Sequence, residues 1–271
     1  MTHSRLFCDG WQFLWQELGS TLEQVQEKTA EFTAVNIPHD WQIYHADRLY
    51  EDGTGWYRKV FQLDKDADTC YEIYFEGIYM DSLIYLNGQQ VGEWKYGYSS
   101  FFIDLTKQLQ DGENELLVRV QYQSPNTRWY SGAGIYRNVY WKESPAIHFA
   151  TDSAYLVSRP TDDTLHLWTV EASVDVVAKE AVDVKETELQ IQILDMEEKL
   201  LASEKKTCVL GEWRITTQVS KRDACLSMKS MWMKCLPISN SNVHLFRLCA
   251  KQWNKRWKSK QEKKLQNLKW K

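Results

Sequence analysis

The sequence contains no apolar run of about 18 residues, the length that a helix needs to cross a membrane. Its first ten residues also lack the apolar stretch of a secretory signal peptide. Both absences favour a soluble, cytoplasmic protein without a membrane partner.

Motifs for metals, nucleotides and redox chemistry are absent as well. The six cysteines form no CxxC pair and have no metal-ligand spacing with histidine, which excludes a zinc or thiol–disulfide motif. No P-loop, Rossmann fingerprint or nucleophile elbow occurs, and the glycines of Ser131-Gly132-Ala133-Gly134 lack phosphate-binding spacing. We therefore expect no metal and no cofactor.

Basic residues are scarce early in the chain and frequent at its end. From Lys221 onward there are fourteen Lys and Arg against two acids, so this stretch carries about +12 and the remainder about −16. The tail, 221–271, shows no clean period of two, and we predict an irregular segment, translated out of register with its parent gene. The alternative is a basic helix that binds nucleic acid or anionic lipid, but charge alone rarely specifies a partner, and we expect no nucleic-acid partner.

Aromatic residues are abundant, with thirteen tryptophans and fourteen tyrosines in 271 residues. Such rings fill cores and also offer flat faces for sugars. For any single ring, core packing is the commoner role. With 43% hydrophobic residues, the chain has ample material for a buried core.

Residues 71–141 carry the clearest strand signals. Runs rich in β-branched and aromatic residues flank Asn87-Gly88, a dipeptide typical of a tight hairpin turn. In Glu115–Gln121, alternation places Leu116, Val118 and Val120 on one face of a strand. Together these signals predict an all-β, antiparallel, two-layer sheet structure.

Further strands are predicted after a connection at Pro145. The segments 154–157, 165–172, 187–194 and 213–219 are strand-like and separated by turns, and Leu189, Ile191 and Ile193 alternate. These are fewer strands than the roughly seven of an immunoglobulin-like sandwich.

Three motifs in order resemble a known family. They are Asn36-Ile37-Pro38-His39-Asp40-Trp41, then Gly53-Thr54-Gly55-Trp56-Tyr57-Arg58-Lys59, and then the loop from Asn126 to Trp141. These three motifs are similar to the amino-terminal part of glycoside hydrolase family two, the β-galactosidase and β-glucuronidase family. The resemblance implies a jelly-roll sugar-binding domain over 1–145, a partial immunoglobulin-like β-sandwich over 146–220, and the tail after it.

The resemblance also bears on catalysis. The family's two catalytic glutamates lie on a (β/α)₈ barrel, and a barrel takes about 250 residues, for which this chain has no room. Asn114-Glu115 looks like the family's acid/base pair, but it leads into a strand and is better explained structurally. We therefore expect no catalytic residues and a non-catalytic fragment of a β-galactosidase-like hydrolase. The alternative is a free-standing carbohydrate-binding module without an enzymatic parent.

The candidate site residues follow from the family's placement of these motifs beside its substrate. They are Asn126, Arg128, Trp129, Tyr130, His39 and Asp40. Amide and guanidinium groups suit sugar hydroxyls, and aromatic rings offer stacking faces.

Structural roles are open at the same positions. His39 and Asp40 would only cap a turn, Trp129 would be core, and Arg137 would pair with an acid beneath the sheet. The expected partner is a β-galactoside or related sugar, bound weakly by the chain alone. The parent enzyme is expected to be a homo-oligomer.

Overall fold

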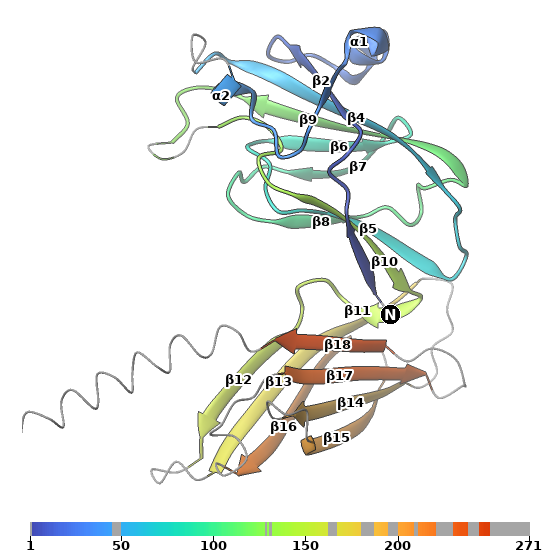
Figure 1. The fold of residues 1–271 in the computed structure, drawn as a ribbon, viewed down its shortest axis with the longest axis vertical. Helices are drawn as coiled ribbons and strands as arrows, with labels where there is room; N and C mark the ends of the chain where they lie inside the picture. Colours follow the sequence, from blue (N-terminus) through green and yellow to red (C-terminus); the bar gives the residue numbers. More distant parts are fainter. Residues whose placement is uncertain are drawn as a thin grey trace, which may run out of the picture. The chain divides into compact units, whose positions relative to one another are not determined.

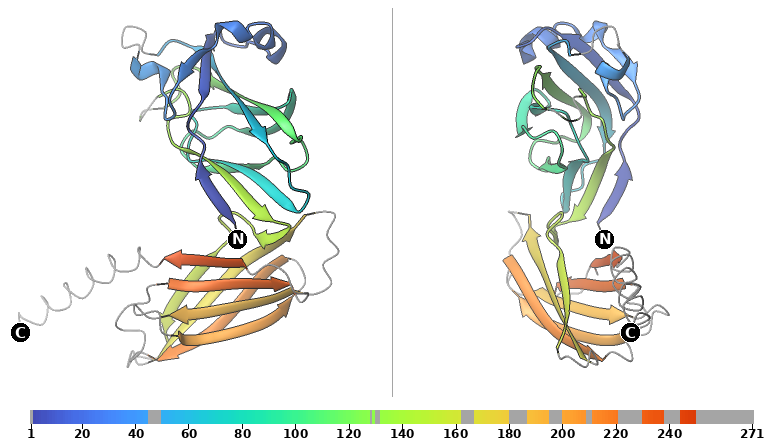
Figure 2. Two further views of the ribbon diagram at one scale, coloured as in Figure 1. Left: turned by 45° about the vertical axis from the view of Figure 1, so that its right-hand side comes forward. Right: turned by 90° about the vertical axis from the view of Figure 1, so that its left-hand side faces the viewer.

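The structure is a computed structural model that describes residues 2–44, 50–127, 129, 132–161, 167–179, 187–194, 200–208, 211–220, 230–237 and 244–249. It divides into two compact units, Thr2–Pro145 and the chain from Ala146 onward. Both are built almost entirely from antiparallel strands, as predicted (Figures 1 and 2). Within the described ranges, no helix has the length and apolar character to span a bilayer.

The first unit consists of two sheets. One has the order β3-β2-β4-β9-β6-β7 and the other the order β1-β10-β5-β8. The strands are β1 His3–Leu6, β2 Trp11–Gln16, β3 Thr33–Val35, β4 Gly53–Leu63, β5 Thr69–Phe75, β6 Ser82–Leu86, β7 Gln89–Trp94, β8 Phe101–Asp104, β9 Gly112–Tyr122 and β10 Val139–Pro145. The helical turns are α1 Leu22–Gln26, the 3₁₀ turn η1 Thr29–Glu31 and α2 Trp41–Tyr44.

The main core of this unit contains residues from both sheets. Leu116, Val118 and Val120 of β9 are fully buried, which confirms the predicted alternation. From the other sheet, Trp141 packs with its ring centroid 5.3 Å from that of Phe7. The burial of many large rings stabilises the sandwich, because each removes a large apolar area from water.

A second, smaller core covers the other face of β9. Leu117 is buried there with Trp56 and Val25. Val25 belongs to α1, which begins at a capping box formed by Thr21 and Gln24. Alternation alone places Leu117 opposite the main core, whereas the structure adds a helical turn that buries this second face.

The predicted hairpin is present between β6 and β7. Asn87 and Gly88 have φ values of 49° and 79°, the left-handed geometry that this turn requires. The Asn87 side chain also bonds to the neighbouring strand β9, since its Nδ2 donates to Oδ1 of Asn114 at 2.9 Å and its Oδ1 accepts from the backbone N–H of Glu115 at 2.9 Å. These bonds tie the turn to β9, the strand that pairs with β6 on its other side.

The second unit also has two sheets. One consists of β11-β13-β12 with β16 paired to β13, and the other has the order β15-β14-β17-β18. The strands are β11 Ile147–Phe149, β12 Tyr155–Pro160, β13 Leu167–Ala178, β14 Thr187–Leu194, β15 Leu200–Cys208, β16 Gly211–Ser220, β17 Ser230–Pro237 and β18 His244–Cys249. Along β13, alternate residues Val170, Ala172, Val174 and Val176 are buried.

Two of these strands differ from the expectation of an irregular tail over 221–271. β17 pairs with β14, and β18 pairs with β17. The physical reason is that β17 is largely apolar although the stretch around it is basic: the register sets Met231, Met233 and Cys235 opposite Ile193, Ile191 and Leu189. With β17 and β18, the described part of this unit is not short of strands.

Candidate functional site

All three sequence motifs meet at one end of the first unit: backbone hydrogen bonds join the first to the third, and Tyr57 of the second contacts His39. The backbone N–H of His39 donates to Ile135 O at 2.8 Å, and that of Trp41 donates to Ala133 O at 3.0 Å. On the other side, Gly134 exchanges two backbone hydrogen bonds with Tyr79, at 2.8 and 2.9 Å. The loop after β9 is thereby held between the segment of His39 and Trp41 on one side and the segment of Tyr79 on the other (Figure 1).

Asp40 is the buried anchor of this arrangement. Its side chain is 6% exposed, and Oδ1 accepts from the backbone N–H groups of Gln42 at 3.0 Å and Ala133 at 3.1 Å. The first bond caps the start of α2. Gln42 in turn bonds to the backbone of Tyr50 and Glu51. Asp40 therefore positions the loop, and its place among the sugar-contacting residues stays a prediction.

His39 lies half-buried beside two aromatic rings. Its Nδ1 is 2.8 Å from the hydroxyl of Tyr57, and its ring centroid lies 4.8 Å from that of Phe13. The Tyr57 hydroxyl also lies 3.4 Å from the backbone carbonyl of His39. These contacts fix the ring orientation, and a direct contact of His39 with sugar likewise stays a prediction.

Gly134 fits a place where a side chain would not. Its φ is +130°, and a Cβ at this position would collide with the Tyr57 hydroxyl and the His39 carbonyl. The close approach of the two motifs therefore depends on glycine at this position.

Asn126 and Trp129 are the exposed candidates. Asn126 Oδ1 accepts from the Tyr79 hydroxyl at 2.9 Å, and its Nδ2 donates to Gln123 O at 2.8 Å. Trp129 is 83% exposed, so the alternative that it is core is wrong. Arg128 and Tyr130 lie outside the described residues. The loop thus presents an indole and an oriented amide at the surface.

Tyr79 is a site residue that sequence reasoning missed. Burial, together with a hydrogen bond to Tyr98, raises its pKa well above the ordinary value for tyrosine. The phenol therefore stays protonated and can donate to Asn126 across the neutral pH range. Its position between β5 and β6 gives no local sign of a partner 47 residues away.

Asn114 and Glu115 have structural partners. Asn114 is buried, and its Oδ1 accepts from the backbone N–H of Gln110 at 3.0 Å. Glu115 Oε1 accepts from Arg58 Nε at 2.6 Å. This geometry matches the structural interpretation of the pair. Among the described residues, no group of three His, Cys, Asp or Glu is placed to hold a metal ion.

Residues 10–145 match the family model described as "Glycosyl hydrolases family 2, sugar binding domain". The chain is 39% identical over 173 residues to Beta-galactosidase BoGH2A of Bacteroides ovatus, covering 58% of this chain and 20% of that protein. It is 26% identical over 207 residues to a Beta-glucuronidase of Formosa agariphila, covering 65% and 20%. The chain thus spans about a fifth of the length of these relatives.

The fold has close counterparts among solved structures. Bacteroides uniformis beta-glucuronidase 2 superposes with a TM-score of 0.75 at 20% identity, covering 92% of this chain and 32% of that one. At this identity the likeness concerns the fold, and it includes both units.

Proposed function

Because the chain belongs to glycosyl hydrolase family 2, we propose that its first unit positions a β-galactoside at the rim of a glycosidase active site whose catalytic groups lie elsewhere in the longer relatives. The observation that carries this proposal is the loop clamped by Asp40 and Gly134, which presents Trp129 to solvent. Loops held on rigid sandwiches are suited to binding roles.

The exposed groups match the chemistry of a pyranose. The Trp129 indole can stack on the apolar face of the sugar, and the Asn126 amide can exchange hydrogen bonds with its hydroxyls. Because Tyr79 holds the amide oxygen, the amide enters such contacts already oriented. A β-galactoside is favoured over a β-glucuronide because the relative at 39% identity is a β-galactosidase.

The chain by itself is proposed to be catalytically inactive. A retaining glycosidase needs two carboxyl groups about 5 Å apart beside the scissile bond. Glu115 is engaged by Arg58 within the sheet, and Asp40 is buried as a backbone acceptor. Neither is available as a general acid or nucleophile.

Two experiments test the proposal. The purified chain should show no hydrolysis of an aryl β-galactoside above the buffer rate, and turnover by contaminant-free protein would contradict inactivity. A chimera in which residues 2–145 replace the corresponding domain of BoGH2A should retain β-galactosidase activity. In it, Trp129→Ala and Arg128→Ala should each lower kcat/KM by about tenfold, or about 1.4 kcal/mol. Unchanged kinetics in both variants would leave the loop with a purely supporting role.

A further inference from the structure

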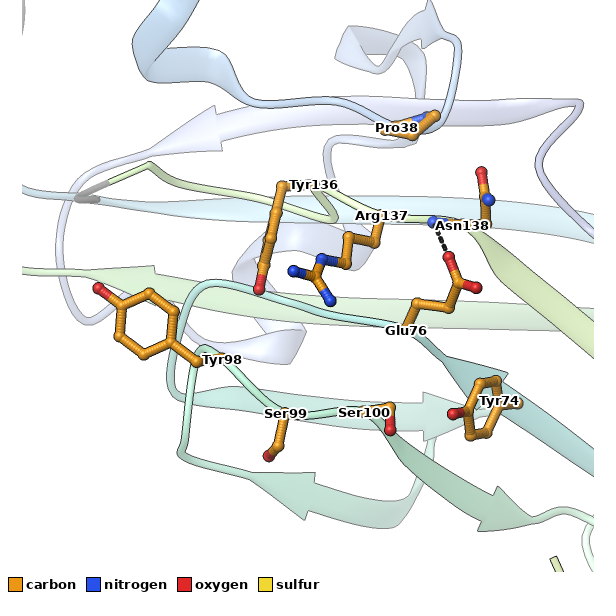
Figure 3. A pocket seen from close by; sticks show the side chains of 9 residues that line it. All are labelled: Pro38, Tyr74, Glu76, Tyr98, Ser99, Ser100, Tyr136, Arg137 and Asn138. Atoms are coloured by element: carbon orange, nitrogen blue, oxygen red, sulfur yellow. Dashed lines mark hydrogen bonds between the residues drawn. The ribbon is translucent and has the colours of Figure 1, made fainter. Parts of the chain in front are cut away.

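A pocket of about 710 Å³ opens at another part of the first unit. Its walls come from Pro38 in the segment before α2, the end of β5, the segment before β8 and the segment before β10. Figure 3 shows the Arg137 guanidinium in the middle of these walls, between the Tyr136 ring and Glu76, with Tyr98 and Ser99 across the opening.

The polar groups of the pocket include both donors and acceptors. Arg137 is exposed and has five N–H donors, while the Glu76 carboxylate offers roughly four acceptor positions. Glu76 Oε2 accepts from the backbone N–H of Asn138 at 3.3 Å, which pins one side of this carboxylate. Arg137 and Glu76 are the two charged residues in the described lining, so their charges balance.

Two tyrosine rings in the pocket wall are held in place by their neighbours. The Tyr136 hydroxyl donates to Gly97 O at 2.9 Å, and a Cβ at Gly77 would lie 2.8 Å from atoms of this ring. Tyr98 packs edge-on against Tyr79 with centroids 5.4 Å apart. Ser99 Oγ accepts from the Trp94 indole at 3.3 Å, so its own O–H remains available as a donor.

We propose that this pocket is a second saccharide site and that it takes a neutral pyranoside. Adjacent sugar hydroxyls need donors and acceptors at once, and Arg137, Ser99 and Glu76 provide them beside aromatic faces. A phosphate or uronate would meet the Glu76 carboxylate, which disfavours anions. This inference goes beyond the proposed function, because Asn126 and Trp129 do not line the pocket, although Tyr136, Arg137 and Asn138 at the far end of the same loop do. Tyr79 contacts both sites: its hydroxyl donates a hydrogen bond to Asn126, and its ring packs against Tyr98 in the pocket wall.

The test is an NMR titration of the full chain that follows the Arg137 side-chain Nε–H resonance, assigned with Arg137→Lys. Methyl β-galactopyranoside should shift this resonance saturably, with a Kd in about the millimolar range for one small site. Arg137→Ala and Glu76→Gln should each weaken binding by about fivefold or more. Arg159→Ala, an exposed arginine of the second unit, is the matched control and should bind as wild type. Glu76→Gln keeps an acceptor oxygen for the backbone N–H of Asn138. A urea unfolding curve equal to that of wild type shows that this variant is folded.

Several results would overturn the pocket proposal. Absence of a saturable shift would do so, as would unchanged affinity in both pocket variants. Tighter binding of glucuronate than of the methyl galactoside would reject a neutral ligand. If Trp129→Ala abolishes sugar binding while the pocket variants leave it intact, the pocket proposal fails and the loop proposal stands. If the pocket variants weaken binding and Trp129→Ala leaves the activity of the chimera unchanged, the loop proposal fails and the pocket proposal stands.

Discussion

Oδ1 of Asp40 accepts a hydrogen bond from the backbone N–H of Ala133, 93 positions further along the chain, at 3.1 Å. The bond joins the start of α2 to the loop that carries Trp129. Asp40→Ala would leave the buried N–H groups of Ala133 and Gln42 without an acceptor, at a cost of about 3 kcal/mol in the free energy of unfolding. Asp40→Asn keeps an acceptor oxygen and should cost less. Urea denaturation measures both, and equal losses would show that the charge, rather than the bonds, matters.

Gly134→Ala tests the close approach of the two motifs. The added Cβ combines a φ of +130° with a collision against the Tyr57 hydroxyl and the His39 carbonyl. We expect a loss of about 3 kcal/mol in unfolding free energy.

Gly112→Ala is the matched control for this change. Gly112 has φ +88° and no heavy atom within 4 Å of an added Cβ, so this variant reports backbone strain alone. We expect it to cost about 1 kcal/mol. Equal losses in the two variants would mean that the motifs do not press on each other at Gly134.

Trp129→Ala should leave stability almost unchanged. The side chain is 83% exposed, so its removal gives up little buried area, and we expect a change within about 0.5 kcal/mol. Trp56→Ala, which removes a fully buried indole, should cost about 4 kcal/mol and is the contrasting case. Thermal and urea unfolding distinguish the two, and a large loss for Trp129→Ala would argue for a packing role.

Alkaline pH should destabilise the first unit. Burial raises the pKa of Tyr79, Tyr85, Tyr122 and Tyr136 above the ordinary value of 10.0. A raised folded-state pKa gives stability that is complete below pH 10 and is lost as the pH rises through the folded pKa, because the unfolded chain releases its protons first. Unfolding free energy should therefore fall over the pH interval that begins at the ordinary tyrosine pKa of 10.0 and extends upward.

Tyr136→Phe isolates one contribution to this alkaline loss. The variant should lose less unfolding free energy over that pH interval than wild type, although it starts lower because its bond to Gly97 is gone. Tyr50→Phe, an exposed tyrosine of the same unit, controls for loss of a phenol. Parallel pH curves for wild type and Tyr136→Phe would refute the assignment.

Met233→Pro tests whether the tail strands belong to the second unit. β17 lies between β14 and β18, and proline at its middle removes a backbone N–H and breaks the ladder, at a cost of about 3 kcal/mol or more. Amide hydrogen exchange of β14 should accelerate in this variant and much less in Met233→Ala, while β9 stays protected. No change at β14 would favour an irregular tail.

The sequence predicts best where a pattern is local. The Asn87-Gly88 turn and the buried face of β9 follow from short-range rules, and the segment 187–194 coincides with β14. The helical turn over Leu117 does not follow, because five residues are too few to show a helical period. The partners of Asp40 and Tyr79 are set by tertiary packing, which no local spacing reveals. In the tail, β17 is a short, largely apolar segment within a lysine-rich stretch, and its length is too small to stand out from the charge bias.

Strand β1 pairs antiparallel with β10, and His3 lies opposite Glu143. Paired Cα atoms in such a ladder are about 5 Å apart, so the start of β1 and the end of β10 lie close together, and with them the two ends of the Thr2–Pro145 unit. A short linker could therefore join the two ends of the unit covalently. The unit could be circularly permuted at the β6–β7 turn, or inserted into a surface loop of an unrelated host, without pulling its two sheets apart.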